Sequence, residues 1–335
     1  MYILGVDGGN TKTDYYLFDV NGKFVDFYRG GTCSHEGLKD SFEGSYRVMK
    51  EVLDNFFNKN NINVDNISAA VFGLAGVDTP FQKTKLEEVV QRLGFKNYRV
   101  VNDSFLGIKA GTDNGVGVCS INGTGTSSGG IDDEGNYLQV GGIGAIVGDE
   151  AGGYHLSRMA IRACFDECYR FGKKTSLTPI VFDLLGVTDK YYLMERISDY
   201  YLTRKVDYTI LTKAIFDEAN KKDEVSLEIL SKTAENLARS AGGAVASLIY
   251  RGRPQIVLAG SVWVKGSCPH MINEFKRFIN EFTKRDCDIR VLTVPPATGA
   301  IIWALELHNN AFPTLEVRND IIKQVEIELQ KQEAK

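Results

Sequence analysis

The first hundred residues alternate between short apolar runs and clusters of turn residues. The apolar runs predict strands at 3–7, 14–20, 24–29, 68–74 and 98–102. The turn sequences Gly8–Thr13 and Asn21-Gly22 separate the first three strands, as in a β-meander. Apolar residues spaced three and four apart predict helices at 39–58 and 79–93. The order βββαβαβ predicts a mixed sheet flanked by helices.

A second meander is predicted at 115–142, and it repeats the first. At a fixed offset of 113 residues, four pairs coincide: Thr11 with Thr124, Thr13 with Thr126, Asp19 with Asp132, and Gly22 with Gly135. Each half of the chain is therefore predicted to carry a Thr-x-Thr turn, a strand and a second turn. Chance coincidence in a sequence rich in hairpins is the alternative interpretation.

The remainder of the chain is predicted to be mainly helical up to Tyr250, because apolar residues recur there at helical spacing. Beyond it we expect strands at 255–258 and 288–294, a helix starting at Ala297, and an amphipathic helix at 315–335.

A chain of 335 residues is long enough for two packed domains, and two domains imply a cleft between them. The repeat places the boundary near residue 115. We therefore expect an N-terminal domain at 1–115 and a C-terminal domain at 116–313 that carries a helical insertion. The last helix, 314–335, is a candidate to pack back on the N-terminal domain.

Composition narrows the class of protein. The net charge of −4 and the absence of a Lys/Arg-rich tract argue against a nucleic-acid partner. The chain starts with a strand pattern and without a basic segment, a long apolar run or a cleavage site, so we expect a soluble cytoplasmic protein with no membrane association. The six cysteines form no C-x-x-C pair, and reduced structural thiols are expected.

The two Thr-x-Thr turns are candidates for holding phosphate. Glycine-rich hairpin turns offer backbone N–H groups and hydroxyls to an anion, although a plain β-turn explains each turn equally well. Asp7 ends an apolar strand beside the first turn, where a magnesium ion, met through water, would compensate its charge. Lys12 is either a point charge for a phosphate or a solvated turn residue.

Four short segments of the chain resemble ligand-binding or hinge motifs, and their order along the chain is informative about the family. They are Val6–Thr13, Ile121–Thr126, Ile256–Val262 and Pro296–Ala300. In this order they resemble the first phosphate motif, the second phosphate motif, the adenosine motif and the closing hinge helix of the N-acetylglucosamine kinase and BadF/BadG/BcrA/BcrD ATPase family. That family lies within the actin/hexokinase/Hsp70 superfamily, and the resemblance covers nearly the whole chain.

The resemblance implies an α/β fold of two actin-like ATPase (ribonuclease H-like) domains around a nucleotide cleft. It implies ATP as co-substrate and Mg²⁺ held at Asp7. The implied ATP-phosphate residues are Gly8, Gly9, Asn10, Thr11, Lys12, Thr13, Gly123, Thr124, Gly125 and Thr126. The implied adenosine-binding residues are Ala259, Gly260 and Ser261.

Asp103 matches the position at which these kinases remove the proton from the sugar hydroxyl. It ends one predicted strand and opens a helix, so the alternative is an N-cap. The resemblance also implies that the sugar is bound by Ser34, His35, Asn102, Asp103, Asp149 and Glu150. Around His35 the sequence departs from the family, because Ser34 replaces an asparagine and Glu36 an aromatic residue. This departure puts the identity of the sugar in doubt.

The function implied is an ATP-dependent kinase that phosphorylates an amino sugar at its C6 hydroxyl, N-acetylglucosamine or a related N-acetylhexosamine. Glucosamine, N-acetylmuramic acid and glucose stay open as acceptors. The resemblance also implies a homodimer. One alternative is a BadF/BcrA-type ATPase activator of a redox enzyme with an iron–sulfur cluster. Cys164 and Cys168, four residues apart on one predicted helix face, are candidate ligands, although a buried helix stripe explains them equally well. A sugar-sensing repressor is disfavoured because no DNA-binding segment is recognisable.

Overall fold

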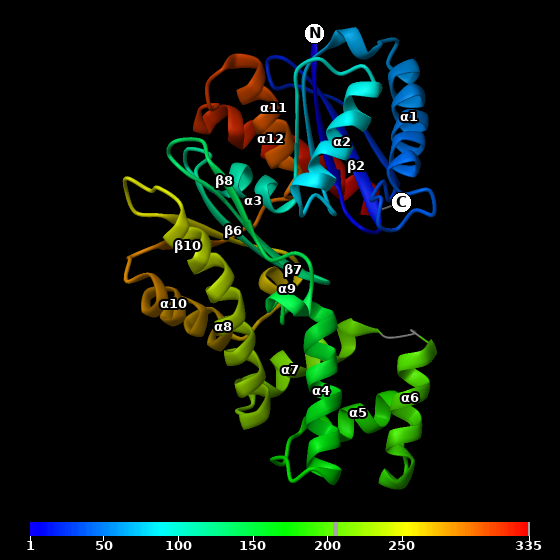
Figure 1. Cartoon of the computed structure of the whole chain (residues 1–335), viewed down its shortest axis with the longest axis vertical. Coiled ribbons are helices and arrows are strands. Elements are labelled where there is room, and N and C mark those ends of the chain that lie inside the picture. Colours follow the sequence, from blue (N-terminus) through cyan, green and yellow to red (C-terminus); the bar gives the residue numbers. More distant parts are fainter. Residues whose placement is uncertain (204–206, 334–335) are drawn as a thin grey trace.

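The computed structural model describes residues 1–203 and 207–333, and it contains two five-stranded mixed sheets (Figure 1). The first sheet consists of β1 Tyr2–Gly8, β2 Lys12–Asp19, β3 Phe24–Gly31, β4 Ile67–Leu74 and β5 Tyr98–Val101. Its helices are α1 Ser41–Lys59, α2 Pro80–Arg92 and α3 Ser104–Gly111. The predicted order βββαβαβ is therefore confirmed.

The second sheet consists of β6 Gly117–Asn122, β7 Thr126–Ile131, β8 Tyr137–Val140, β9 Gln255–Ala259 and β10 Asp288–Val291. Between β8 and β9 the chain forms α4 Gly152–Tyr169, α5 Leu177–Leu185, α6 Leu193–Thr203, α7 Tyr208–Asn220 and α8 Glu224–Ser247. Short 3₁₀ helices occur at Val64–Asn66, Ala145–Val147 and Lys190–Tyr192. The remaining helices are α9 Ser261–Lys265, α10 Pro269–Thr283, α11 Ala297–Asn309 and α12 Leu315–Glu333.

The two sheets have the same topology. Their strand orders are β3-β2-β1-β4-β5 and β8-β7-β6-β9-β10, so each strand of the first sheet has its equivalent in the second. In both sheets the first two pairings are antiparallel and the last two are parallel. The second meander is thus a structural copy of the first, and α4–α8 lie between its last antiparallel strand and its return to the sheet.

The predicted repeat is confirmed at the level of single hydrogen bonds. Oδ1 of Asp19 accepts from the backbone N–H groups of residues 21 and 23, and Oδ1 of Asp132 accepts from those of residues 134 and 136. Gly22 and Gly135 follow with φ values of +83° and +80°, a conformation that favours glycine. Two turns 113 residues apart therefore have the same backbone and the same side-chain cap.

Three hydrophobic clusters hold the layers together. The first cluster lies between the first sheet and the helices α1 and α2. In the second cluster, the helical insertion α4–α8 packs together with α10 against the second sheet. Between the two sheets lies a shared cluster formed by α3, α11 and α12. Figure 1 shows α11 and α12 beside the first sheet, and α4–α7 extending away from both sheets.

Helices α3 and α11 cross closely between the sheets. A Cβ atom on Gly299 of α11 would lie 1.9 Å from the backbone oxygen of Leu106 of α3, so a side chain there would force the helices apart. A Cβ on Gly5 of β1 would meet the Ile301 side chain at 2.8 Å. The segment predicted to be the closing hinge helix therefore contacts both α3 and the first strand.

The C-terminal helix α12 lies against the first sheet and the connection between the sheets. Gln324 accepts from the backbone N–H of Phe24 and donates to the backbone oxygen of Gly22. Arg318 donates to the backbone oxygens of Thr112 and Asp113. We propose that the domain boundary lies in this connection, at 115/116, with α12 belonging to the N-terminal domain.

Some predicted boundaries differ from the observed ones. The first turn is shorter than predicted because Gly8 and Thr13 still pair in the β1–β2 ladder. The strand expected at 288–294 ends at Val291, before Pro295-Pro296. Helix α10 was not predicted at all, although Pro269 at its N-terminus and its strongly one-sided apolar face are clear signals. Among the described residues, no helix is both long and apolar enough to cross a membrane.

Candidate active site

The candidate catalytic residues lie at one edge of the first sheet. Strands β1, β4 and β5 run parallel, so their carboxyl ends meet at the same edge, where α/β proteins commonly bind ligands. Asp7 lies near the end of β1, and Asp103 lies two residues after the end of β5 at Val101. The charge of Asp103 reaches Asp7, because it is the second cause, after desolvation by burial, of the raised pKa of Asp7.

Asp103 occupies the N-cap position of α3 but does not cap the helix with its side chain. Instead, the neighbouring Asn102 accepts a hydrogen bond from the backbone N–H of Ser104 at 3.0 Å. Asp103 is partly exposed as a residue, and desolvation of its carboxyl by burial, followed by the charge of Asp78, raises its pKa to about 6. A carboxylate with this pKa can accept a proton at neutral pH.

The pKa of Asp7 is raised further than that of Asp103. Desolvation by burial, followed by the charges of Asp103 and Asp14, raises its pKa to about 7, although Lys12 and Arg29 oppose the shift. Arg29 itself binds the Asp14 carboxylate through two hydrogen bonds of 2.6 and 2.8 Å. In the part of the chain that the structure describes, no ion pair neutralises Asp7 or Asp103.

This electrostatic environment fits a divalent cation. A cation beside Asp7 would remove the repulsion that raises its pKa. Within residues 1–203 and 207–333, no group of three or more His, Cys, Asp or Glu side chains is arranged to hold a metal. Magnesium in phosphoryl-transfer sites takes one or two carboxylates, with water and substrate phosphate filling the other positions. Asp7 alone is therefore a sufficient protein contribution.

The first Gly/Thr turn is open at its tip. The backbone N–H of Gly9 donates to the backbone oxygen of Lys12, while Asn10 and Thr11 are exposed. Thr13 is buried and accepts from the backbone N–H of Cys33, so its hydroxyl is occupied within the fold. Lys12 is about half exposed and lies 3.4 Å from a carboxylate oxygen of Asp14. Gly8, in the β1 ladder, is buried.

The second turn is fixed to the start of α4. The backbone N–H of Gly123 donates to the backbone oxygen of Gly125, and the N–H of Gly153 donates back to Gly123. Asn122, which is fully buried, accepts from the backbone N–H of Gly152 through its side chain. Thr124 and Gly125 are exposed, and Thr126 donates its hydroxyl to the backbone oxygen of Ile121. The amino end of α4, with its positive dipole, therefore lies beside this turn.

A pocket of about 600 Å³ opens next to the second turn. It is lined by Gly123, Thr124, Gly153, Asp207, Thr209, Thr212, Lys213, Phe216, Asp217, Ser261, Val262, Lys265, Gly266 and Ser267. The lining combines polar residues of the second turn with apolar side chains of α7 and α9, Phe216 and Val262. This combination suits a nucleotide, which has a charged phosphate end and a flat apolar base.

The predicted adenosine residues divide between this pocket and the core. Ser261 lines the pocket, whereas Ala259 is buried inside β9 and does not. Gly260 has a φ of +98°, and a Cβ there would lie 2.6 Å from the backbone oxygen of Asn122. Gly260 therefore allows the adenosine segment to approach the second turn, instead of lining the pocket itself.

The segment around His35 contains polar groups without partners. Ser34 and His35 are 4% and 8% exposed, and neither the Ser34 hydroxyl nor Nδ1 of His35 has a hydrogen-bond partner among the described residues. The imidazole stacks on Phe42 at 4.3 Å between ring centroids. Burial lowers the pKa of His35, so its ring is neutral at pH 7. Buried polar groups normally find a partner, and a bound ligand would supply one.

Asp149 and Glu150 have different surroundings. One oxygen of Asp149 accepts from the backbone N–H groups of Gly142 and Gly144, each at 2.8 Å, which shapes the glycine-rich loop before α4. Glu150 is exposed, and its backbone oxygen accepts from Asn236 of α8. Glu36 lies near Asp78, since Gln82 bonds both the Glu36 carboxylate and the backbone N–H of Asp78. Desolvation by burial, followed by the charges of Glu36 and Asp149, raises the pKa of Asp78.

Several residues of the site were not predicted from the sequence. Asp78 accepts hydrogen bonds from Asn102 and from Gln139, which is 61 residues away in β8. Gln82 forms a capping box with Thr79 and extends its amide nitrogen toward His35 and Glu36. The capping box was a recognisable signal, since Thr79-Pro80 precedes Gln82 at the required spacing. No sequence periodicity connects Asp78 with Gln139.

The two cysteines proposed as cluster ligands lie on α4. Cys164 is fully buried in the core of the helical insertion, and Cys168 is partly buried one turn later. Burial raises the pKa of Cys164 to about 12, which favours the protonated thiol over the thiolate that binds iron. This placement weighs against an iron–sulfur cluster shared between subunits.

Two curated proteins are similar to this chain over most of its length. The chain is 28% identical to the N-acetylmuramic acid/N-acetylglucosamine kinase of Clostridium acetobutylicum over 281 residues, which cover 83% of this chain and 90% of that protein. It is 26% identical to the N-acetyl-D-glucosamine kinase of Dictyostelium discoideum over 314 residues, which cover 90% and 97%.

The fold also matches solved sugar kinases. A ROK family glucokinase from Streptomyces griseus, solved with glucose and AMPPNP, superposes with a TM-score of 0.54 at 16% identity, covering 93% of this chain and 99% of that one. With the two equivalent sheets, this match confirms the predicted α/β fold of two actin-like ATPase domains. Residues 4–304 match the family model directly. The chain therefore belongs to the BadF/BadG/BcrA/BcrD ATPase family.

Proposed function

We propose that this chain is an ATP-dependent kinase that transfers the γ-phosphoryl group to the C6 hydroxyl of an amino sugar. The proposed acceptor is N-acetylglucosamine or a related N-acetylhexosamine. Two relatives that are similar over most of their length are named as kinases of such sugars, which supports this substrate class. Cytoplasmic location and a homodimer remain predictions.

Asp103 is the residue on which this proposal chiefly rests. Its carboxylate takes no part in capping α3, it is partly open, and its pKa is about 6. A carboxylate held in this way is suited to accept the proton of a sugar hydroxyl as the oxygen attacks phosphorus. The γ-phosphoryl group of ATP then passes to the sugar oxygen, the bond from phosphorus to the ADP oxygen breaks and ADP leaves, and Asp103 takes the proton of the sugar hydroxyl.

The pocket beside the second turn is the proposed nucleotide site. Its apolar part, between Phe216 and Val262, would hold the adenine, and Gly123 and Thr124 would hold the phosphates. The exposed tip of the first turn, Asn10 and Thr11, would meet the phosphates from the first domain. Magnesium, when bound near Asp7, would neutralise charge on the phosphate oxygens.

The sugar is proposed to bind between the His35 segment and the Asp149 loop. Ser34 and His35 offer unpaired polar groups, and a sugar hydroxyl or acyl oxygen can pair with both. Asn102 and Asp149 act by shaping the backbone, since their side chains already bind backbone N–H groups. Glu150 is exposed and free to rotate toward a sugar hydroxyl on domain closure.

The direct test measures ADP formation by purified protein with MgATP and a panel of sugars. Turnover that depends on N-acetylglucosamine, with a hexosamine 6-phosphate as the product, is expected. Product position is read by NMR, because phosphorylation at C6 splits the C6 carbon signal through coupling to phosphorus. ATP hydrolysis that does not depend on any sugar would contradict the proposal.

A further inference from the structure

Asp78 connects the two domains beside the proposed base. It lies in the loop between β4 and α2, and its Oδ1 atom accepts two hydrogen bonds. One comes from Nδ2 of Asn102 at 3.0 Å, in the same domain. The other comes from Nε2 of Gln139 at 2.6 Å, in the edge strand of the second sheet. A single carboxylate oxygen therefore joins the catalytic loop to the other domain.

Both partners of Asp78 are themselves fixed. Asn102 is 3% exposed, and its Oδ1 atom caps α3 through the N–H of Ser104. Gln139 also donates to the backbone oxygen of Gly141 at 3.2 Å, at the start of the loop that Asp149 shapes. Asp78 itself is anchored because its backbone N–H donates to Gln82 of the capping box.

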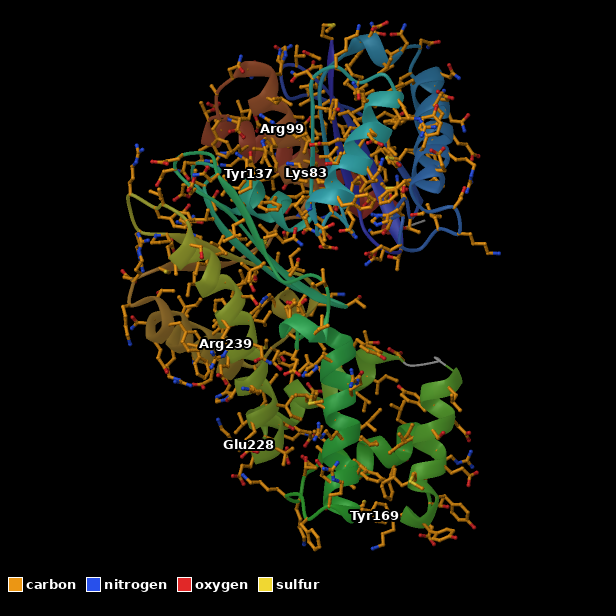
Figure 2. All side chains as sticks on the ribbon, viewed as in Figure 1. Lys83, Arg99, Tyr137, Tyr169, Glu228 and Arg239 are labelled. Carbon is orange, nitrogen blue, oxygen red and sulfur yellow. The ribbon has the colours of Figure 1, made fainter. Side chains whose placement is uncertain are left out.

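The loop of the second domain lies directly against Asp78. A Cβ atom on Gly142 would lie 2.7 Å from Oδ1 of Asp78, so the glycine permits this approach. The contact between the domains continues at Tyr137, two residues before Gln139 on β8. The ring of Tyr137 stacks on Trp303 of α11 and contacts Phe105 of α3. Figure 2 labels Tyr137 at this junction, near Arg99 of the first domain.

We infer that Asp78 is a positioning residue of the phosphoryl-transfer site, which sets the Asp103 loop in register with residues 139–149 of the second domain. This inference rests on the proposed function. Asn102 donates a hydrogen bond to Asp78 and accepts one from the backbone N–H of Ser104 in the first turn of α3. Asp103 lies between Asn102 and Ser104 in the chain, so these two bonds fix the backbone on both sides of it. When the domains are brought together, the bond to Gln139 aligns the sugar-side loop with the base.

The charge of Asp78 has a second effect, which makes its role measurable. The groups that face Asp103 are Asp7 of β1, Asp78 and the Cys119 thiol of β6, and Asp78 raises the pKa of Asp103. The charged groups that face Asp78 are Glu36 and Asp149. Removing the charge of Asp78 should therefore lower the pKa of Asp103 and move the acid limb of kcat/KM to lower pH.

Three variants separate the charge from the hydrogen bonds. Asp78→Asn removes the charge and retains an oxygen that accepts from Asn102 and Gln139. Asp78→Ala removes both. Gln139→Leu removes the bond between the domains, together with the weaker bond from Gln139 to the backbone oxygen of Gly141, and leaves the charge of Asp78 in place. Each is assayed for sugar-dependent ADP formation from pH 5 to 9 at saturating MgATP, and thermal unfolding establishes that each variant is folded.

Asp78→Asn should move the acid limb of kcat/KM down by on the order of 1 pH unit, with a small loss of kcat. Asp78→Ala should move the limb equally and lower kcat by roughly 10- to 100-fold. Gln139→Leu should lower kcat and leave the limb in place. An acid limb that stays fixed in Asp78→Asn, or full kcat in Asp78→Ala, would overturn the role of Asp78. Should Asp78→Ala not fold, Asp78→Asn and Gln139→Leu still decide it.

The assay of the wild-type protein tests the proposed function independently of the variants. Sugar-dependent turnover by the wild type with unchanged variants overturns only the role of Asp78. Absence of sugar-dependent turnover in the wild type overturns the proposed function, and the role of Asp78 in it falls as well.

Discussion

The Oδ1 atom of Asn102 accepts a hydrogen bond from the backbone N–H of Ser104 at 3.0 Å, and this bond caps α3 in place of the Asp103 carboxylate. From the sequence alone, either Asn102 or Asp103 could cap α3. In the structure Asn102 does so. Asn102 stabilises the helix, and Asp103 is left free for chemistry. The division has consequences for stability as well as for activity.

Asn102→Ala should destabilise the fold, whereas Asp103→Ala should not. Loss of an N-cap side chain costs about 1 kcal/mol, and Asn102→Ala also leaves Asp78 without one of its donors. Urea unfolding of both variants at pH 7 measures the difference. Equal destabilisation by the two substitutions would mean that Asp103 is a structural cap.

The crossing of α3 and α11 should not tolerate a methyl group. Gly299→Ala places a Cβ 1.9 Å from the backbone oxygen of Leu106, and such overpacking costs about 1–3 kcal/mol. Gly243→Ala is the matched control, because no atom lies within 4 Å of the Cβ it adds to helix α8. The control should be neutral or stabilising by up to about 1 kcal/mol. Similar unfolding free energies for the two variants would contradict the close crossing.

The raised pKa of Asp7 predicts a pH-dependent stability. Its folded-state pKa of about 7 exceeds the ordinary value near 3.8, so the folded protein binds this proton more tightly than the unfolded chain. Asp7 therefore costs stability increasingly as pH rises from about 4 to 7. Without metal, Asp7→Asn should stabilise the protein at pH 8 by on the order of 1 kcal/mol, after allowance for solvent screening, and have little effect at pH 4.

The measurement is urea unfolding in the presence of a chelator at both pH values. Adding MgADP should then stabilise the wild type more than Asp7→Asn, because only the wild type retains the carboxylate for the ion. A loss of stability in Asp7→Asn at pH 8 would show that Asp7 is compensated within the fold and is not the proposed magnesium contact.

Glu36 should disfavour an anionic acceptor. Its charge acts on Asp78 together with that of Asp149, so the acceptor side of the site is acidic. N-Acetylmuramic acid carries a carboxylate that N-acetylglucosamine lacks, and we expect a lower kcat/KM for it. Repulsion of about 1 kcal/mol in water-like surroundings corresponds to roughly fivefold, so Glu36→Gln should raise kcat/KM for N-acetylmuramic acid by about this factor.

The matched control is Glu51→Gln, which removes an exposed carboxylate from α1. It should leave the ratio of kcat/KM for the two sugars unchanged. If Glu36→Gln changes kcat/KM for both sugars by the same factor, the Glu36 charge does not select between them.

The fold was largely predictable because its signals are local. Alternating apolar runs marked the strands, and the Asp-x-x-Gly turns after β2 and β7 marked the repeat, since each turn is specified by a capping aspartate and a glycine of positive φ. Asp103 was proposed from its resemblance to the catalytic position of the family, and it lies between the end of β5 at Val101 and the start of α3 at Ser104. These features depend on neighbours within a few residues.

The rest of the site depends on contacts between distant segments. Sequence reasoning could not decide whether Asn102 or Asp103 caps α3, because both residue types are good caps. It placed Ala259 at the nucleotide, whereas β9 buries this residue in the core. It did not find the bond between Asp78 and Gln139, since only the packing of the two domains brings them together. Phe216, in the proposed nucleotide pocket, has the sequence pattern of an ordinary core residue of α7.

The most direct test of this account is ADP formation with MgATP across a panel of sugars, by the wild type and by Asp103→Asn. The account predicts N-acetylhexosamine-dependent turnover by the wild type, and a kcat reduced about 10²- to 10⁴-fold in the variant with little change in the KM for sugar. Turnover that survives the loss of the Asp103 carboxylate, or ATP hydrolysis that no sugar stimulates, would contradict it.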